Sequence, residues 1–217
     1  MTQQERQAHS RREILQAATE EFGRLDYAQV NMENICKNHN ISKGMMYHYY
    51  SNKDELFLLC VEDTFHTLRE YVERDKDSLD GRSIPDRIKG YLMIREYFFQ
   101  LYPKHKRIFE TAMLHPPKHL YQQIQALREP LRQLNREFLE QTIEVRNLRP
   151  GLERDRAIRY LESIEIVLEE IFLREQLDMH IKDLHTLLEV ASGTIDMLLY
   201  GVLQQDQMIA AVDLDQQ

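Results

Sequence analysis

The stretch Ile41 to Lys53, which reads ISKGMMYHYYSNK, most constrains how this chain can fold. Ser42 can cap a helix, because its hydroxyl can accept a hydrogen bond from a free N–H of the first turn. Met46, Tyr49 and Tyr50 lie three and four positions apart, so they can share one buried face. The opposite face of this short helix carries little bulk, which suits entry into a groove about 12 Å wide.

A second short helix is predicted just before this stretch. Asn31 can cap it, and Glu33 then lies in the first turn, near the positive end of the helix dipole. Asn40 stands where a tight turn needs a left-handed residue, a conformation that Asn tolerates better than most. Two short helices joined by a tight turn, over residues 31–50, predict a helix-turn-helix.

Composition favours an all-α chain that folds without crossing a membrane. Seven Gly and six Pro among 217 residues are few, which favours helices with short connections. No run of 18 apolar residues occurs, and the N-terminus lacks the apolar segment of a signal peptide. Cys36 and Cys60 have no CxxC spacing, so we interpret them as reduced, buried thiols of a cytoplasmic protein.

The distribution of charge is more informative than the net charge of −8. Residues 34–53 contain no acid, but they contain three lysines and two histidines. Residues 57–217 hold 21 basic and 28 acidic residues, so the acidity lies mainly where it would not meet phosphates.

Helical patterns cover the rest of the chain. The first helix is expected over residues 10–24, after a mobile terminus that either is merely solvated or acts as an arm on DNA. Pro130 is expected to kink or divide the helical stretch 118–145. The other predicted helices are residues 52–77, 83–102, 104–114, 153–176 and 182–205.

Residues 14–56 resemble the DNA-binding domain of the TetR family of transcriptional regulators. The matching pieces are IL-x-AA-x-x-x-F from residue 14, Tyr27, M-x-x-I from residue 32, and ISKG-x-x-Y-x-YY-x-x-K-x-x-L from residue 41. Asp26, Asn31, Asn40 and Tyr50 depart from the usual residues, and all four replacements are chemically tolerable. The resemblance covers about a quarter of the chain, and beyond it only the helical layout matches.

The resemblance implies an all-α fold of two domains. Residues 1–56 would form a three-helix domain with the helix-turn-helix, and residues 57–217 a larger helical domain for effector binding and dimerisation. The residues expected to bind DNA are Asn31, Ser42, Lys43, Gly44, Met45, Tyr47, His48 and Lys53. Tyr49 and Tyr50 are expected in the core, and Lys53 is expected on a phosphate.

The last two predicted helices carry more apolar surface than one core-facing stripe requires. The resemblance implies that they pair with their copies in a homodimer, and a purely internal helix is the alternative. The residues expected at this interface are Leu161, Leu168, Leu187, Ala191, Leu198 and Val202.

Aromatic and sulfur side chains collect between residues 91 and 138. Singly, such residues are more often core than ligand wall, but the resemblance implies a cavity for a partly apolar effector among these helices. The residues expected to line it are Tyr91, Phe98, Tyr102, Phe109, Met113, Tyr121 and Phe138, with Glu165 and Glu169 as polar anchors.

No catalytic or metal-binding pattern stands out. His115 and His119 are four apart but separated by two prolines, and no HExxH, GxSxG, P-loop or GxGxxG occurs. We therefore expect no enzyme, no metal and no cofactor.

The sequence thus predicts a ligand-responsive repressor that binds a palindromic DNA operator as a homodimer and is released by a small-molecule effector. The alternative is an all-helical ligand-binding or interaction protein without DNA binding.

Overall fold

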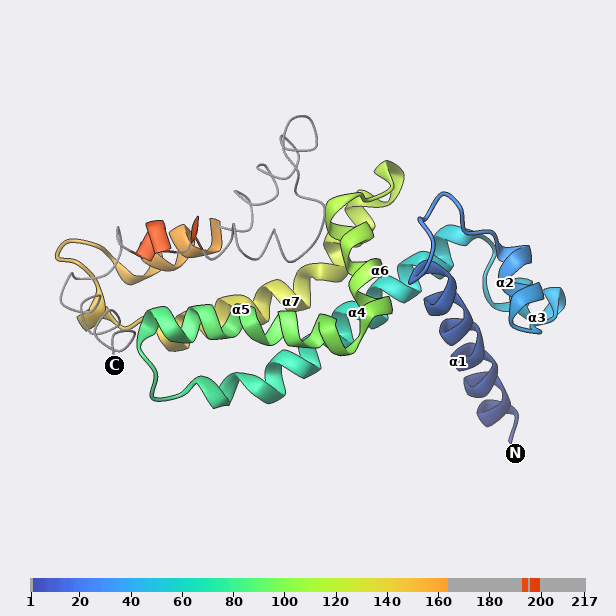
Figure 1. Cartoon of the computed structure of the whole chain (residues 1–217), viewed down its shortest axis with the longest axis horizontal. Helices are drawn as coiled ribbons and strands as arrows, with labels where there is room; N and C mark the ends of the chain where they lie inside the picture. The colour runs from blue at the N-terminus through green and yellow to red at the C-terminus, as the bar shows by residue number, and fades with distance from the viewer. Residues whose placement is uncertain (1, 164–192, 195, 200–217) are drawn as a thin grey trace. The chain divides into compact units, whose positions relative to one another are not determined.

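The computed structural model describes residues 2–163, 193–194 and 196–199, and these residues form helices and no strand (Figure 1). The predicted all-α fold is confirmed. Local contacts divide the chain into two compact units: unit 1 holds residues 1–67 and 99–129, and unit 2 holds residues 68–98 and 130–217. The predicted domain boundary after residue 56 stays a prediction. Unit 1 extends to residue 67 and also includes residues 99–129.

Unit 1 begins with α1 (Gln3–Phe22), α2 (Met32–Asn38), α3 (Lys43–Tyr49) and the first part of α4 (Lys53–Asp75). It is completed by α6 (Pro103–Leu114), the 3-10 turn η2 (Lys118–Leu120) and the first turns of α7 (Tyr121–Thr142). Its core joins Ile14 and Phe22 of α1 to Ile35, Met46 and Phe57, all fully buried. Both cysteines are buried free thiols in this core, as predicted for their burial.

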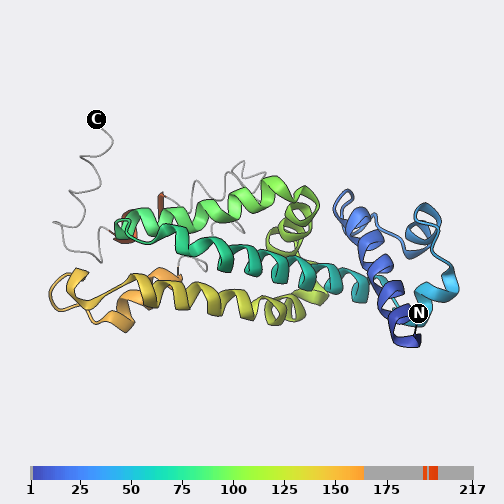
Figure 2. The ribbon, with the colours of Figure 1, turned by 90° about the horizontal axis from the view of Figure 1, so that it is seen from below.

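Unit 2 contains the end of α4, the 3-10 turn η1 (Lys76–Leu79), most of α5 (Ile84–Leu101) and the second half of α7. The 3-10 turn η3 (Val145–Asn147) and a helix over residues 154–163 follow. The parts of α4, α5 and α7 in this unit run alongside one another (Figure 2). Ring contacts join them: Tyr71 packs on Phe98, and Tyr91 stacks on Phe138 with ring centroids 3.8 Å apart.

The expected start of the first helix is wrong. The N-terminus is not irregular up to Ser10, because α1 already begins at Gln3 behind a capping box formed by Thr2 and Glu5. The motif T-x-x-E at residues 2–5 is the signal that could have predicted this start. Of the two outcomes expected at Pro130, division is excluded because α7 is helical on both sides of it, and a kink stays a prediction.

Candidate nucleic-acid interface

The turn between α2 and α3 is built by local hydrogen bonds that the sequence predicts. The Asn31 side chain accepts a hydrogen bond from the Glu33 N–H at 2.8 Å, and Ser42 accepts one from Met45 at 3.0 Å. Asn40 has φ of 53°, which confirms the left-handed position. The buried Ile41 donates its N–H to the Cys36 carbonyl at 2.9 Å, so the turn is fixed against the end of α2.

The α3 helix has one buried side and one solvent side. Met46 is fully buried, while Tyr49 and Tyr50 are half-buried, so the expected core placement holds only in part for the tyrosines. On the other side, Tyr47 is 50% exposed. Lys43, Gly44 and His48 are also exposed, and Met45 is half-buried. A Cβ built on Gly44 would meet nothing within 4 Å.

Lys43 is not a free positive charge. Its ammonium lies 2.6 Å from a carboxylate oxygen of Glu33, and this hydrogen bond raises the pKa of Lys43. Glu33 precedes the acid-free residues 34–53 in sequence, yet the fold brings it beside them. Both side chains are more than half exposed, so a phosphate can compete with Glu33 for Lys43.

Lys53 is held in place by Tyr27, which lies in the loop after α1. Its ammonium donates a hydrogen bond to the Tyr27 carbonyl at 2.9 Å and lies 4.2 Å from the Tyr27 ring centroid. The Tyr27 hydroxyl in turn donates to Asp54, whose other oxygen lies 2.9 Å from Nε2 of His119. Lys53 therefore has a structural role, and its phosphate contact stays a prediction.

These contacts shift the pKa values of Tyr27 and Asp54. Burial and the hydrogen bond to Asp54 both raise the pKa of Tyr27, so the phenol stays protonated. The hydrogen bond from Tyr27 lowers the pKa of Asp54 despite partial burial, and His119 adds to that effect. The cluster ties the start of α4 to the loop after α1 and to η2.

The first turns of α1 lie beside α3 and extend the candidate interface. A hollow of about 390 Å³ is bordered by Arg6 and Ser10 of α1 and by His48 and Tyr49 of α3. The Arg11 guanidinium lies 5.5 Å from the Tyr49 ring centroid. These α1 residues were not among the named DNA contacts, although an N-terminal arm on DNA was one of the two alternatives for this terminus.

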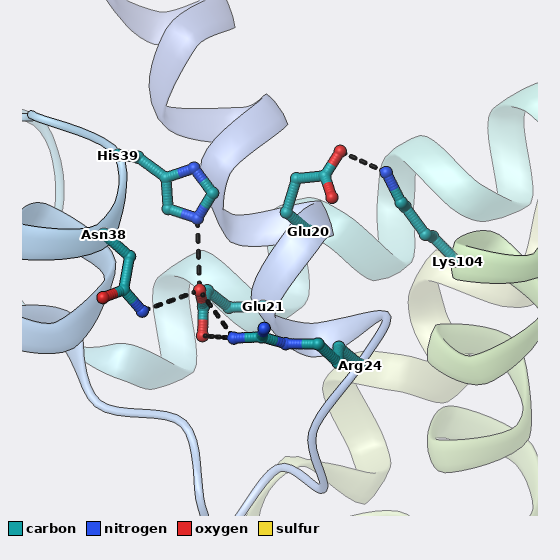
Figure 3. Close-up of polar contacts among 6 residues, drawn as sticks. All are labelled: Glu20, Glu21, Arg24, Asn38, His39 and Lys104. Carbon is teal, nitrogen blue, oxygen red and sulfur yellow. Dashed lines mark hydrogen bonds and ion pairs between the residues drawn. The ribbon is translucent and has the colours of Figure 1, made fainter.

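Figure 3 shows the polar contacts that hold α1 to α2. Glu21 is only 4% exposed, and its carboxylate accepts a hydrogen bond from Asn38 at 3.0 Å. Nε2 of His39 lies 3.2 Å away, and Arg24, in the turn after α1, donates at 3.3 Å. Burial alone would raise the pKa of Glu21, but the bonds from Asn38 and His39 and the charge of Arg24 lower it overall.

A second set of contacts joins α1 and the loop after it to α6. Lys104 forms an ion pair with Glu20, and Arg107 forms one with Asp26 (Figure 3 for the first pair). A Cβ built on Gly23 would lie 2.6 Å from the Lys104 Cβ and 2.9 Å from its Cα. Gly23 is thus needed for the close approach of α6 to the end of α1.

The residues predicted to line an effector cavity are divided between the two units. Tyr91, Phe98 and Phe138 are buried in unit 2, where the stacked rings of Tyr91 and Phe138 fill the space between their helices. Unit 1 holds Phe109 and Met113, both half-buried, and Tyr102 and Tyr121, both more than 40% exposed. Glu165 and Glu169 lie outside the described residues. The cavity stays a prediction.

Only two of the predicted dimer residues are described. Leu161 is 3% exposed within its own protomer, which indicates internal packing, while Leu198 is half-buried. Leu168, Leu187, Ala191 and Val202 lie outside the described residues.

The described part of the chain contains no group of three or more His, Cys, Asp or Glu residues arranged to hold a metal ion. None of its helices has the length and apolar character needed to cross a bilayer.

Comparison with known proteins places the candidate interface in a family. Residues 14–60 match the family model of bacterial regulatory proteins of the tetR family. The chain is 33% identical over 72 residues to the uncharacterized HTH-type transcriptional regulator YhgD of Bacillus subtilis, a match covering 33% of this chain and 36% of that protein. It is 31% identical over 71 residues to the biofilm operon icaADBC HTH-type negative transcriptional regulator IcaR of Staphylococcus epidermidis, covering 31% of this chain and 38% of IcaR. These matches span little more than a third of either relative.

The likeness of fold extends much further than the likeness of sequence. The structure of the transcriptional regulator FadR from Bacillus subtilis, solved in complex with stearoyl-CoA, aligns with a TM-score of 0.62 over 87% of this chain and 97% of FadR. Identity in that alignment is 16%, so it supports the fold alone. Taken with the capped α2–turn–α3 unit inside the matched residues, these comparisons show that residues 14–60 are similar to the DNA-binding domain of the TetR family of transcriptional regulators.

Proposed function

We propose that this protein is a repressor that binds a palindromic DNA operator as a homodimer and releases it when a small molecule binds. The observation that carries the proposal is the solvent side of α3. A capped, two-turn helix presents Lys43, Tyr47 and His48 within the residues that match the family. These side chains are suited to phosphates and base edges in a major groove.

The shape of α3 supports close approach to DNA. Gly44 has open space beside it, so its backbone can come near a phosphate or a base edge. Arg6 and Ser10 of α1 border the same hollow as His48, and they can contact phosphates beside the groove that α3 enters.

We propose a homodimer because one such short helix can contact only a few base pairs. Seven residues of α3 reach few bases, whereas two copies placed one helical turn of DNA apart, about 34–36 Å, read a palindrome. We assign the dimer contact to the last two predicted helices, including Leu198. Such a regulator acts in the cytoplasm, on the chromosome.

Repression and release are supported by relatives. IcaR is named a negative regulator, and FadR was solved with stearoyl-CoA, a ligand with a long apolar chain. For this chain we propose a partly apolar effector bound among the helices that carry the aromatic residues 91–138.

The contacts within unit 1 offer a route for the signal. The α6 helix is fitted against the end of α1 at Gly23 and Lys104, and η2 reaches the start of α4 through His119 and Asp54. An effector that displaces α6 would therefore shift α1 and, with it, α3. The effector can act only through its difference in affinity for the two arrangements.

Selection of bound sequences from a random DNA pool, followed by titration at several salt concentrations, tests the proposal. We expect an enriched palindrome whose affinity falls steeply with salt. The alternative, an all-helical ligand-binding or interaction protein without DNA binding, predicts no enrichment. The absence of any binding at low salt would overturn the repressor proposal.

A further inference from the structure

A polar cavity of about 520 Å³ lies in unit 2, where α5 begins and α7 ends. Its walls come from the loop Gly81–Ser83, from Thr142 at the end of α7 and from the turn η3. Both views place these segments at the same end of the helices (Figures 1 and 2). None of the described residues predicted for the effector cavity lines it.

Positive charge prevails in the cavity wall. The side chains of Arg82, Arg87 and Arg146 line it, against the single carboxylate of Glu144. Glu144 pairs with Arg146 at 2.7 Å. Asp80, beside the cavity, lies 3.1 Å from a terminal nitrogen of Arg87.

Arg82 is left with spare hydrogen-bonding capacity. Its guanidinium forms no ion pair with the described residues, although it lies close to Gly90 on α5. A planar guanidinium offers several donors in a fork that matches a carboxylate or a phosphate. Arg82 is therefore the cation in this wall that is available for a ligand.

Two buried polar atoms at the cavity have no hydrogen-bond partner among the described residues: Oγ1 of Thr142 and Nε of Arg87. Thr142 is only 3% exposed, so its hydroxyl is shielded from bulk water. Buried polar groups are almost always hydrogen-bonded, because leaving one unpaired costs its full desolvation. Each of the two groups therefore keeps a donor that no described residue satisfies.

The start of α5 adds a favourable field. Ser83 and Ile84 line the cavity, and α5 is an 18-residue helix whose positive dipole end lies there. The Ser83 hydroxyl accepts the Asp86 N–H at 3.3 Å and donates to its carboxylate at 2.5 Å, so the cap itself is closed. The dipole thus reinforces the arginines rather than forming a site alone.

We infer that this cavity binds the anionic oxygens, carboxylate or phosphate, of a small molecule. Arg82 supplies the charge, and Arg87 Nε and the Thr142 hydroxyl donate the orienting hydrogen bonds. The cavity is larger than a free phosphate ion, so it has room for the organic part of such a ligand. The inference does not depend on DNA binding.

Isothermal titration of the full-length protein with four probes tests this inference at constant ionic strength set by sodium chloride. The probes are inorganic phosphate, phenyl phosphate, benzoate and benzyl alcohol. We expect saturable binding of at least one anionic probe, and none of benzyl alcohol, which lacks the charge. Comparison of phenyl phosphate with benzoate tells which oxyanion the site prefers. Absence of saturable binding by all three anions would overturn the inference.

Two variants locate the binding. Arg82→Gln removes the available cation and is expected to weaken binding of the preferred anion about tenfold or more. Arg159→Gln removes an exposed arginine elsewhere in unit 2 and should leave binding unchanged. Equal affinities in the two variants would contradict the assignment to this cavity.

Thr142→Val provides a second, independent readout. Without a probe, its melting temperature should equal or exceed that of the wild type, because the lost hydroxyl has no partner. With the preferred anion, its thermal stabilisation should be smaller than that of the wild type. A lower melting temperature without probe, or an undiminished ligand shift, would count against the role of Thr142.

Discussion

The Glu21 carboxylate of α1 lies 3.2 Å from Nε2 of His39, the residue that ends α2. Together with the bond from Asn38, this contact fixes the first helix of the helix-turn-helix to α1 through a buried charge. The position of α3 depends on that attachment, since α3 follows α2 by only a four-residue turn.

Glu21→Gln is predicted to lower the free energy of unfolding at pH 7 by about 1.5–3 kcal/mol, the usual range for buried hydrogen bonds to a charged group. The matched control is Glu20→Gln. It removes the neighbouring carboxylate, whose ion pair with Lys104 is substantially exposed, and should change stability by less than about 1 kcal/mol. Urea unfolding of both variants measures the difference, and equal losses would contradict the role given to Glu21.

The same contact predicts a pH dependence. Because the folded protein lowers the pKa of Glu21, its contribution is fully present above the unfolded value of about 4.3 and is lost as pH falls through the folded value. Unfolding measured from pH 7 to pH 3 should therefore show less acid-dependent loss in Glu21→Gln than in the wild type. Parallel curves would rule out this linkage.

The local geometry of α2 and α3 could be predicted because it depends on neighbours in sequence. Asn31, Asn40 and Ser42 each act within five residues of themselves, and each lies as predicted. The start of α1 is equally local, because the capping box of Thr2 and Glu5 is a sequence signal within four residues.

The charge environment could not be predicted in the same way. Glu33 meets Lys43, and Glu21 meets His39, only after the turns have formed. Likewise, a count of aromatic residues between 91 and 138 gives no information about which of them pack together, and the structure divides them between two units.

Glu33→Gln is predicted to strengthen DNA binding at every sequence. It removes the carboxylate that competes with phosphate for Lys43, so affinity should rise severalfold at low salt and less at high salt. Glu153→Gln, an exposed acid in unit 2, is the control for net charge. Fluorescence anisotropy with operator and unrelated DNA would settle the point, and an effect no larger than that of the control would refute it.

Lys53→Ala is predicted to have two effects. Loss of the bond to the Tyr27 carbonyl and of the contact with its ring should lower the free energy of unfolding by about 1–2 kcal/mol. If Lys53 also contacts a phosphate, affinity should fall about equally for all sequences, and the salt slope should decrease by about 1. Lys37→Ala, an exposed lysine at the end of α2, is the control. A base-specific loss would contradict the phosphate contact.

Two glycines are predicted to respond oppositely to alanine. Gly23→Ala places a methyl group against the backbone of Lys104 and should destabilise the protein by about 1–3 kcal/mol through overpacking. Gly44→Ala has open space and a better helix former, so stability should stay equal or rise, while operator affinity falls because the methyl group lies on the DNA side. Thermal unfolding and operator titration of both variants give the comparison. Loss of stability in Gly44→Ala, or full affinity in it, would show that α3 is presented differently.

Leu198→Glu is predicted to separate the dimer while leaving the protomer folded. Leu198 is half-buried, whereas its neighbour Leu199 is fully buried, so a charge is tolerated at the first position and not at the second. Light scattering should give the mass of a monomer, with a normal helical circular dichroism spectrum and weak operator binding, because two α3 helices are needed to read a palindrome. Gln141→Glu adds the same charge on an exposed position of α7 and should remain dimeric and bind normally. A Leu198→Glu dimer of full mass would mean that the subunits meet through a different surface.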